Sequence, residues 1–249
     1  MKQKIHLIMP MAGAGSRFFK NGFVMPKPLI EINNKPFLYW STKSITNFID
    51  VQDITFIVLK KHIEEYEIDA QIKEFFPEAK IVIIPEILNG AVLTCMEGIK
   101  EINGDLPIVF NDCDHAFISS EFNTYANGEQ FEKIDGGLLT FESNEPKYSF
   151  LQMDDKGKVI NTVEKKVVSN HAICGAYYFK NKEIFLNCAK EYLNRCNFSE
   201  FFMSGVYNIM AEKKMKIANF KCDIHVPFGT PDEYYSAKDN EIFRKVTEK

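Results

Sequence analysis

The chain begins with the apolar run Ile5-His6-Leu7-Ile8-Met9-Pro10, which passes directly into the loop Met11-Ala12-Gly13-Ala14-Gly15-Ser16-Arg17. A short apolar run that ends in turn-forming residues predicts a buried strand. Glycine and alanine let a backbone approach a polyanion closely and offer it several N–H donors. Arg17 and the proline-flanked Lys27 add positive charge to the same segment. The segment therefore predicts a site that grips a polyphosphate at the end of the first strand.

This loop does not match two common nucleotide-binding motifs. The dinucleotide motif Gly-x-Gly-x-x-Gly would need a third glycine where Phe18 stands, and no Gly-Lys-Ser/Thr closes the loop as in a P-loop. A glycine turn after a strand is often only a tight connection. The combination of strand, small-residue loop, Arg17 and Lys27 is what favours a functional site.

The composition is that of an ordinary globular protein. The 249 residues are 45% hydrophobic and 26% charged, which predicts one α/β domain over residues 1–249. The net charge of −4 argues against a nucleic-acid partner. No stretch approaches the roughly 18 apolar residues of a membrane helix, and the N-terminus lacks a signal peptide. The six cysteines form no Cys-x-x-Cys pair, so we expect a reduced, cytoplasmic protein without membrane insertion.

Apolar runs and helix-like segments alternate in the first half of the chain. The predicted strands are 5–9, 54–59, 81–84, 106–110, 137–141 and 176–179, and the predicted early helices are 36–48, 63–75 and 91–102. This alternation indicates right-handed βαβ crossovers and a three-layer α/β/α, Rossmann-like fold with a mixed, mostly parallel sheet.

The second half of the chain has a different pattern. Residues 150–153 and 159–163 flank the polar turn Asp154-Asp155-Lys156-Gly157, which predicts a β-hairpin that forms one wall of a cleft. Three helices are predicted at 182–194, 200–213 and 233–246.

A pair of carboxylates follows the strand at 106–110, in Asn111-Asp112-Cys113-Asp114-His115. Ligands of open α/β sheets bind beyond the carboxyl ends of strands, and carboxylate oxygens suit Mg²⁺. Cys113 and His115 are zinc-ligand types, but no other ligand pair has zinc spacing, so magnesium is favoured. A polar turn without a metal stays open as the alternative.

The N-terminal segment resembles the sugar-phosphate nucleotidylyltransferases, also called nucleotide-sugar pyrophosphorylases. Members of that family have a glycine-rich loop that ends in Thr/Ser-Arg, and Pro-Lys-Pro follows about ten residues later. This chain has Ser16-Arg17 and Pro26-Lys27-Pro28 at those positions. Met11 stands where leucine is commoner, and Ala14 stands where a second glycine is commoner. The resemblance covers residues 5 to about 235.

The resemblance implies a role for residues along most of the chain. It implies catalytic roles for Arg17 and Lys27, with Asp114 as the Mg²⁺ ligand and Asp112 as a second ligand or an outer-shell group. The implied nucleotide-binding residues are Met11, Ala12, Gly13, Ala14, Gly15, Ser16, Glu86, Asn89 and Gly90, and the implied acceptor-binding residues are Tyr148, Glu164, Lys165, Gly175 and Glu200. Without the resemblance, Asn89-Gly90 would be a strand-to-helix turn and Glu164-Lys165-Lys166 a solvated face.

The sequence departs from the family pattern near its end. A second metal-binding aspartate usually stands two residues before a late Gly-Thr pair, but Pro227 occupies that position before Gly229-Thr230. Asp223 and His225 are nearby substitutes. The chain also ends before any repeat of the C-terminal β-helix that many members carry.

The resemblance implies a reaction in which a nucleoside monophosphate passes from a nucleoside triphosphate to a phosphate monoester. The commonest acceptor of the family is a sugar 1-phosphate, and the products are pyrophosphate and a nucleotide-sugar for polysaccharide synthesis. Three alternatives stay open: a cytidylyltransferase for a non-sugar phosphate, a metal-dependent GT-A-type glycosyltransferase that uses Asp112-Cys113-Asp114, and a non-catalytic nucleotide-binding module. Family members are often dimers or tetramers, which implies a possible homo-oligomer.

Overall fold

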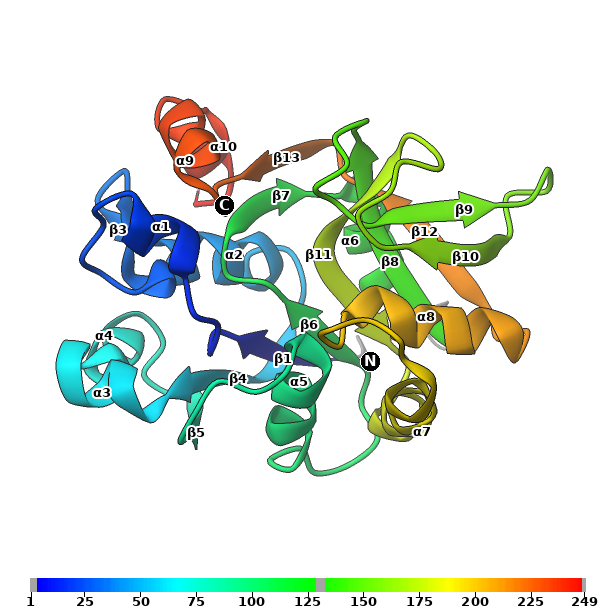
Figure 1. Ribbon diagram of the computed structural model, residues 1–249, viewed down its shortest axis with the longest axis horizontal. Coiled ribbons are helices and arrows are strands. Elements are labelled where there is room, and N and C mark those ends of the chain that lie inside the picture. Colours follow the sequence, from blue (N-terminus) through cyan, green and yellow to red (C-terminus); the bar gives the residue numbers. More distant parts are fainter. Residues whose placement is uncertain (1–3, 129–132, 248–249) are drawn as a thin grey trace.

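A mixed β-sheet forms the centre of the computed structural model, which describes residues 4–128 and 133–247 (Figure 1). Its parallel half consists of β6 (Ile108–Asn111), β1 (Ile5–Pro10), β4 (Val51–Leu59) and β5 (Lys80–Ile84), in that spatial order. β11 (His171–Phe179) pairs antiparallel with β6 and begins the other half. The predicted α/β fold with a mixed sheet is confirmed.

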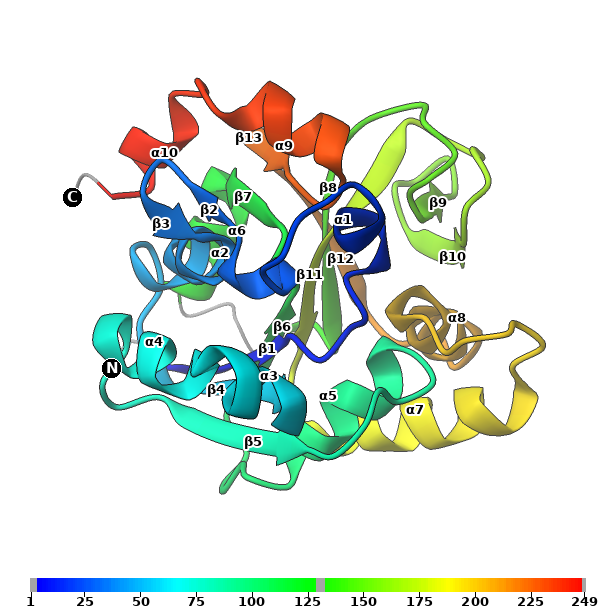
Figure 2. The same cartoon turned by 60° about the vertical axis from the view of Figure 1, so that its left-hand side comes forward.

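The antiparallel half contains the predicted hairpin. β9 (Phe150–Met153) and β10 (Val159–Val163) pair antiparallel at the sheet edge opposite β5 (Figure 2). β8 (Gly136–Glu142) pairs antiparallel with β11 and parallel with β12 (Ile217–Lys221). The hairpin therefore extends the sheet beyond β11 and stands next to the carboxyl end of β6.

Helices cover both faces of the sheet. Ile5, Leu7 and Met9 of β1 pack into one core with α2 (Phe37–Thr46), α4 (Ile68–Phe75) and α6 (Ser120–Ala126). Ile8 packs into the opposite core with α5 (Ala91–Ile99), α7 (Lys182–Arg195) and α8 (Met203–Glu212). Figure 1 shows these three helices together on one side of the sheet. This alternation along β1 is the two-residue period of a strand, and it produces the three predicted layers. No helix within residues 4–128 and 133–247 is long and apolar enough to cross a membrane.

A third apolar cluster attaches the C-terminal elements to α2. Phe37 and Trp40 of α2 contact Phe228 and Phe243, with ring centroids 4.5 and 4.7 Å apart respectively. The elements held there are β13 (Ile224–Pro227), α9 (Pro231–Ala237) and α10 (Ile242–Lys245), together with α1 (Ser16–Lys20). The segment after the glycine loop thus packs into the same cluster as α9 and α10.

Two predicted helices are each divided in two. The segment predicted as one helix at 63–75 is α3 (Lys60–Tyr66) and α4, because Glu67 between them is left-handed with φ 51°. The segment predicted at 233–246 is α9 and α10, because the Asn240 side chain accepts a hydrogen bond from Ile242 N and starts a new turn. β7 (His115–Ile118) pairs antiparallel with β13 in a small second sheet, which was not predicted.

The order of the strands places two loops side by side. From β1 the sheet continues on one side to β4 and on the other to β6, so the strand order reverses between β1 and β6. The glycine loop leaves the carboxyl end of β1, and Asp112–Asp114 leave the carboxyl end of β6. Ligands of open α/β sheets bind in the crevice at such a reversal. The fold therefore brings the predicted polyphosphate loop and the predicted metal ligands to one place.

Candidate active site

An ion pair joins the two loops at the strand reversal. Lys27 begins the short 3₁₀ turn η1 (Lys27–Leu29), and its Nζ lies 2.8 Å from Oδ2 of Asp114. A Cβ atom at Gly15 would lie 3.5 Å from the Cβ of Lys27, so the glycine loop packs against the lysine. Burial would lower the pKa of Lys27, but the charges of Asp114 and Asp112 hold it above its usual range. Burial would raise the pKa of Asp114, but the Lys27 ammonium holds it at about 2.

Asp112 is the second carboxylate of the site and has no such partner. Its side chain forms no hydrogen bond or ion pair with any residue of the described chain. Burial and the charge of Asp114 together raise the pKa of Asp112 to about 7. A Cβ atom at Gly175, where φ is +101°, would lie 2.8 Å from Oδ2 of Asp112. Glycine at this position therefore leaves room for the Asp112 carboxylate.

Asp112 and Asp114 fit a hard divalent cation. They supply carboxylate oxygens at a half-buried site, and the repulsion that raises the pKa of Asp112 would be relieved by a cation between them. Pro227 lines the cavity that opens beside these carboxylates, and its side chain offers no ligand atom. Asp223 Oδ2 accepts a hydrogen bond from the backbone N–H of Ser120 at 2.7 Å. Of the two nearby substitutes, His225 alone reaches the cavity wall.

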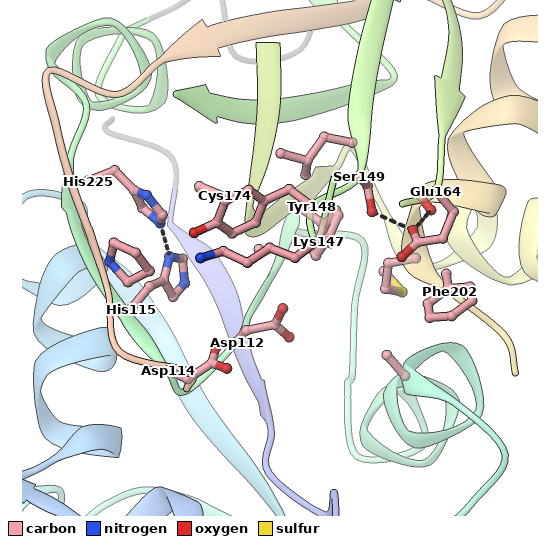
Figure 3. A pocket seen from close by; sticks show the side chains of 18 of the residues that line it. Asp112, Asp114, His115, Lys147, Tyr148, Ser149, Glu164, Cys174, Phe202 and His225 are labelled. Atoms are coloured by element: carbon pink, nitrogen blue, oxygen red, sulfur yellow. Dashed lines mark hydrogen bonds between the residues drawn. The ribbon is translucent and has the colours of Figure 1, made fainter. Parts of the chain in front are cut away.

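A cavity of about 240 Å³ opens beside these carboxylates (Figure 3). Its walls contain Arg17 from α1, both aspartates, and acceptor-side residues from the β8–β9 connection and the end of β10. A smaller cavity of about 150 Å³ is lined by Met11, Gly13 and Lys27 and shares Asp112 and Asp114 with the larger one. The aspartates thus stand between a wall of the glycine loop and a wall of the hairpin.

The hairpin wall carries a hydrogen-bonded carboxylate. Glu164 Oε2 accepts hydrogen bonds from Ser204 Oγ, at 2.8 Å, and from Ser149 Oγ. These serines come from α8 and from the segment before β9, so two elements fix the direction of the Glu164 side chain. Gly175 lines the same cavity. A carboxylate held in this way can accept hydrogen bonds from hydroxyl groups of a polar ligand.

A second polar group on this wall combines Tyr148, Lys147 and Glu233. Tyr148 OH donates to Glu233 Oε1 at 2.8 Å, and Lys147 Nζ lies 2.8 Å from the same oxygen. Burial raises the pKa of Tyr148; burial would lower the pKa of Lys147, but hydrogen bonds to Glu145 and Glu233 raise it. Figure 3 shows the Lys147 side chain extending across the cavity from this wall. Neither Lys147, which directly precedes Tyr148, nor Glu233 was predicted as a site residue from the sequence.

Apart from the glycine loop, five of the expected binding residues lie outside the lining of the larger cavity. Glu86 and Asn89 are exposed in the loop after β5, and a Cβ atom at Gly90 would lie 2.4 Å from the backbone of Phe201. Lys165 and Glu200 pair with each other at 3.6 Å, and Lys165 also stands over the ring of Phe202, which lines the cavity. Gly90 thus has a packing role, while the other four residues surround the site at a greater distance.

The remaining wall of the cavity contains two histidines and a cysteine. His115 Nδ1 lies 3.3 Å from His225 Nε2, and the ring of His225 stacks on Phe141 with centroids 3.9 Å apart. Burial would raise the pKa of Cys174, but hydrogen bonds with Cys222 and His115 lower it to about 6. From the sequence, His115 was considered as a zinc ligand only together with its neighbour Cys113. The cluster of His115, His225 and Cys174 was not predicted, because its members come from three separate strands.

The family model described as nucleotidyl transferase matches residues 6–242. The chain belongs to this family of nucleotidyl transferase enzymes. It is 27% identical to the D-glycero-alpha-D-manno-heptose 1-phosphate guanylyltransferase of Campylobacter jejuni, over 92% of this chain and 96% of the relative.

Solved structures of nucleotidyl transferases have the same fold. The nucleoside-diphosphate-sugar pyrophosphorylase of Vibrio cholerae superposes with a TM-score of 0.81 at 23% identity, over 94% of this chain and all of that chain. The inositol-1-phosphate CTP transferase of T. maritima superposes with a TM-score of 0.76 at 12% identity, over 100% of this chain and 98% of that chain. The enzyme class expected from the N-terminal loop is confirmed, and the glycosyltransferase and non-catalytic alternatives receive no support.

Proposed function

We propose that this nucleotidyl transferase joins a nucleoside monophosphate from a nucleoside triphosphate to a sugar 1-phosphate and releases pyrophosphate. The observation that carries the proposal is the Lys27–Asp114 ion pair, which ties the glycine loop to the carboxylates at the strand reversal. An anionic substrate and a cation placed there would both meet opposite charge. We further propose that residues 1–249 act as one catalytic domain.

The proposed reaction is an in-line displacement at the α-phosphorus. An oxygen of the acceptor phosphate forms the new P–O bond, and the bond to the β-phosphate breaks with pyrophosphate as the leaving group. The acceptor is already anionic at neutral pH, so no general base is required. Such reactions depend on positioning and charge neutralisation more than on covalent chemistry of the protein.

Each wall of the site has a proposed role. The backbone of residues 12–16 and the Arg17 guanidinium hold the β- and γ-phosphates, and Lys27 neutralises charge at the α-phosphate. Asp112 and Asp114 hold Mg²⁺, which when bound would screen the phosphates from one another. Glu164 and Tyr148 bind the acceptor beside Gly175, while Lys165 and Glu200 border its pocket and Glu86, Asn89 and Gly90 form the nucleoside end.

The relatives suggest which substrates to test first. The Campylobacter jejuni relative is a guanylyltransferase of a heptose 1-phosphate, so GTP with a heptose or hexose 1-phosphate is the first pair. The fold is also that of an inositol-1-phosphate CTP transferase, so CTP with a non-sugar phosphate is the second pair.

Pyrophosphate release from each common nucleoside triphosphate, assayed with a panel of phosphate monoesters and Mg²⁺, tests the proposal. We expect release that requires both substrates and forms a nucleotide-sugar detectable by mass. Release with non-sugar phosphates only would replace the acceptor class. Triphosphate binding without release in any combination would contradict the proposed reaction.

A further inference from the structure

Three ligand atoms, from two buried side chains and one half-buried side chain, converge in one wall of the cavity, apart from the two aspartates. They are nitrogens of His115 and His225 and the sulfur of Cys174, and all three lie within 4.8 Å of one another. They come from β7, β13 and β11, which are far apart in the sequence but meet at this wall. Figure 3 shows the two imidazole rings joined by a hydrogen bond on the side of the cavity away from Glu164.

Hydrogen bonds behind His115 leave its other nitrogen, Nδ1, as an acceptor, which in the structure is hydrogen-bonded to Nε2 of His225 at 3.3 Å and would exchange that contact for a metal ion. The Asn111 amide donates from Nδ2 to Ser41 O at 2.9 Å, which turns its Oδ1 toward His115 Nε2 at 3.0 Å. An amide oxygen only accepts, so Nε2 carries the proton and Nδ1 presents a lone pair. Histidines that bind metals commonly donate their second ring N–H to such a buried acceptor.

His225 and Cys174 are held in place by their own strands. The His225 ring is sandwiched between His115 and Phe141, and its Nδ1 is buried without a hydrogen-bond partner in the described chain. Cys174 stands at an irregularity of β11, where the register with β8 shifts between Ile173 and Tyr177. Bulges of this kind redirect a side chain from its regular position. His115 is thus oriented by a hydrogen bond, His225 by packing of its ring, and Cys174 by the irregularity of its strand.

The geometry and the ligand types fit one class of ion. Two nitrogens bound to zinc at about 2.0–2.1 Å in a tetrahedron lie roughly 3.3–3.4 Å apart. The observed separation of His115 Nδ1 and His225 Nε2 is 3.3 Å. Imidazole with thiolate selects zinc-like ions over magnesium, which prefers oxygen ligands. The two nitrogens and the sulfur are therefore ligands for a zinc-like ion, whereas the carboxylate oxygens of Asp112 and Asp114 are ligands for magnesium.

We propose that His115, His225 and Cys174 bind one Zn²⁺, separately from the Mg²⁺ of the carboxylates. All three residues line the cavity, so the fourth coordination position faces the space proposed for the acceptor. The proposal goes beyond nucleotidyl transfer and does not depend on which substrates the enzyme uses.

Metal titration of the chelator-treated protein tests this site. Co²⁺ and then Zn²⁺ are added in excess Mg²⁺, which keeps the carboxylates occupied. We expect one Co²⁺ per chain with a thiolate-to-cobalt charge-transfer band, displaced by one equivalent of Zn²⁺. The Cys174→Ser variant should lose the band and weaken Zn²⁺ binding by about 100-fold or more, since replacing an outer-shell partner alone costs 10–100-fold. The control Cys188→Ser removes another buried cysteine, in α7, and should behave as wild type.

The result is decided by the metal and not by turnover. A Co²⁺ complex of the wild type without the sulfur band, or equal Zn²⁺ affinity in Cys174→Ser and Cys188→Ser, would overturn the proposal. His225→Gln provides a second ligand variant if Cys174→Ser does not fold, and unchanged Zn²⁺ affinity in that variant would also refute the site. Because no substrate is present, failure here leaves the proposed nucleotidyl transfer untouched.

Discussion

Replacing Lys27 with methionine removes the ammonium group that lies 2.8 Å from the Asp114 carboxylate. Methionine keeps most of the volume of the lysine stem and cannot hold an anion. If Lys27 neutralises charge on the α-phosphate, its loss should cost about 2.7–4 kcal/mol of transition-state stabilisation, a fall of roughly 10²–10³ in kcat. The Lys27→Arg variant keeps the charge but not the compact geometry, so we expect an intermediate loss.

The same substitution should have a smaller effect on folding. Breaking a fully buried ion pair from one side costs about 3–5 kcal/mol, because the other charge stays buried and unpaired. The Lys27 and Asp114 side chains keep 23% and 22% of their exposure, so solvent screening reduces the expected loss to about 1–3 kcal/mol. The double variant Lys27→Met/Asp114→Asn removes both charges and should recover most of that stability without recovering turnover.

Two measurements on the same preparations separate these effects. Urea denaturation gives the free energy of unfolding, and pyrophosphate release at saturating substrate gives kcat. A Lys27→Met enzyme with kcat within a few-fold of wild type would refute the role assigned to the lysine. A double variant that regained activity along with stability would show that the ion pair acts only on folding.

Three further outcomes follow from other contacts. Gly175→Ala places a Cβ atom 2.8 Å from Asp112 at a φ of +101°, so isothermal titration should show weaker Mg²⁺ binding, and the variant should lose about 1–3 kcal/mol of stability in urea. Glu164→Gln should raise the KM for the acceptor about 10-fold or more and leave the KM for the triphosphate unchanged, because one charge-assisted hydrogen bond to a hydroxyl is lost. Burial and the charge of Lys61 lower the pKa of His62 in the folded protein. The His62 side chain therefore binds a proton more readily in the unfolded chain, which lowers the free energy of unfolding as pH falls below about 6.5, whereas above that pH the full stability is present. His62→Gln should therefore show a smaller loss of unfolding free energy between about pH 8 and 5.5 than the wild type, and an equal loss would exclude His62 as the source.

Sequence patterns predicted the parallel half of the sheet and the hairpin. The apolar runs at 5–9, 81–84 and 106–110 have the length of strands and are bounded by turn-forming residues, and the polar turn at 154–157 marks its hairpin without help from the rest of the chain. β7 and β13 were not predicted because each has four residues and is stabilised by pairing with the other across more than a hundred positions. Strands of this kind are set by tertiary contacts rather than by local preference.

The site shows the same division between local and distant contacts. Asp112 and Asp114 follow a strand end and Lys27 stands in a short proline-flanked motif, and a sequence can identify both features. Lys147 was given no role from the sequence, because its place in the site depends on Glu233 from α9. A single sequence does not indicate which residues pair with each other when they lie as far apart in the chain as Lys147 and Glu233.

The glycines of the site have two different roles, of which the sequence motif predicted only one. The sequence analysis treated loop glycines as a way for backbone N–H groups to approach a polyanion, and Gly13, with nothing within 4 Å of a Cβ atom, agrees with that idea. Gly15, Gly175 and Gly229 instead adjoin charged side chains; a Cβ atom at Gly229 would lie 2.4 Å from Oδ2 of Asp114. Small residues at these positions let the carboxylates and the lysine approach one another from separate strands. The convergence of charge at the strand reversal therefore depends on glycine as much as on the charged residues themselves.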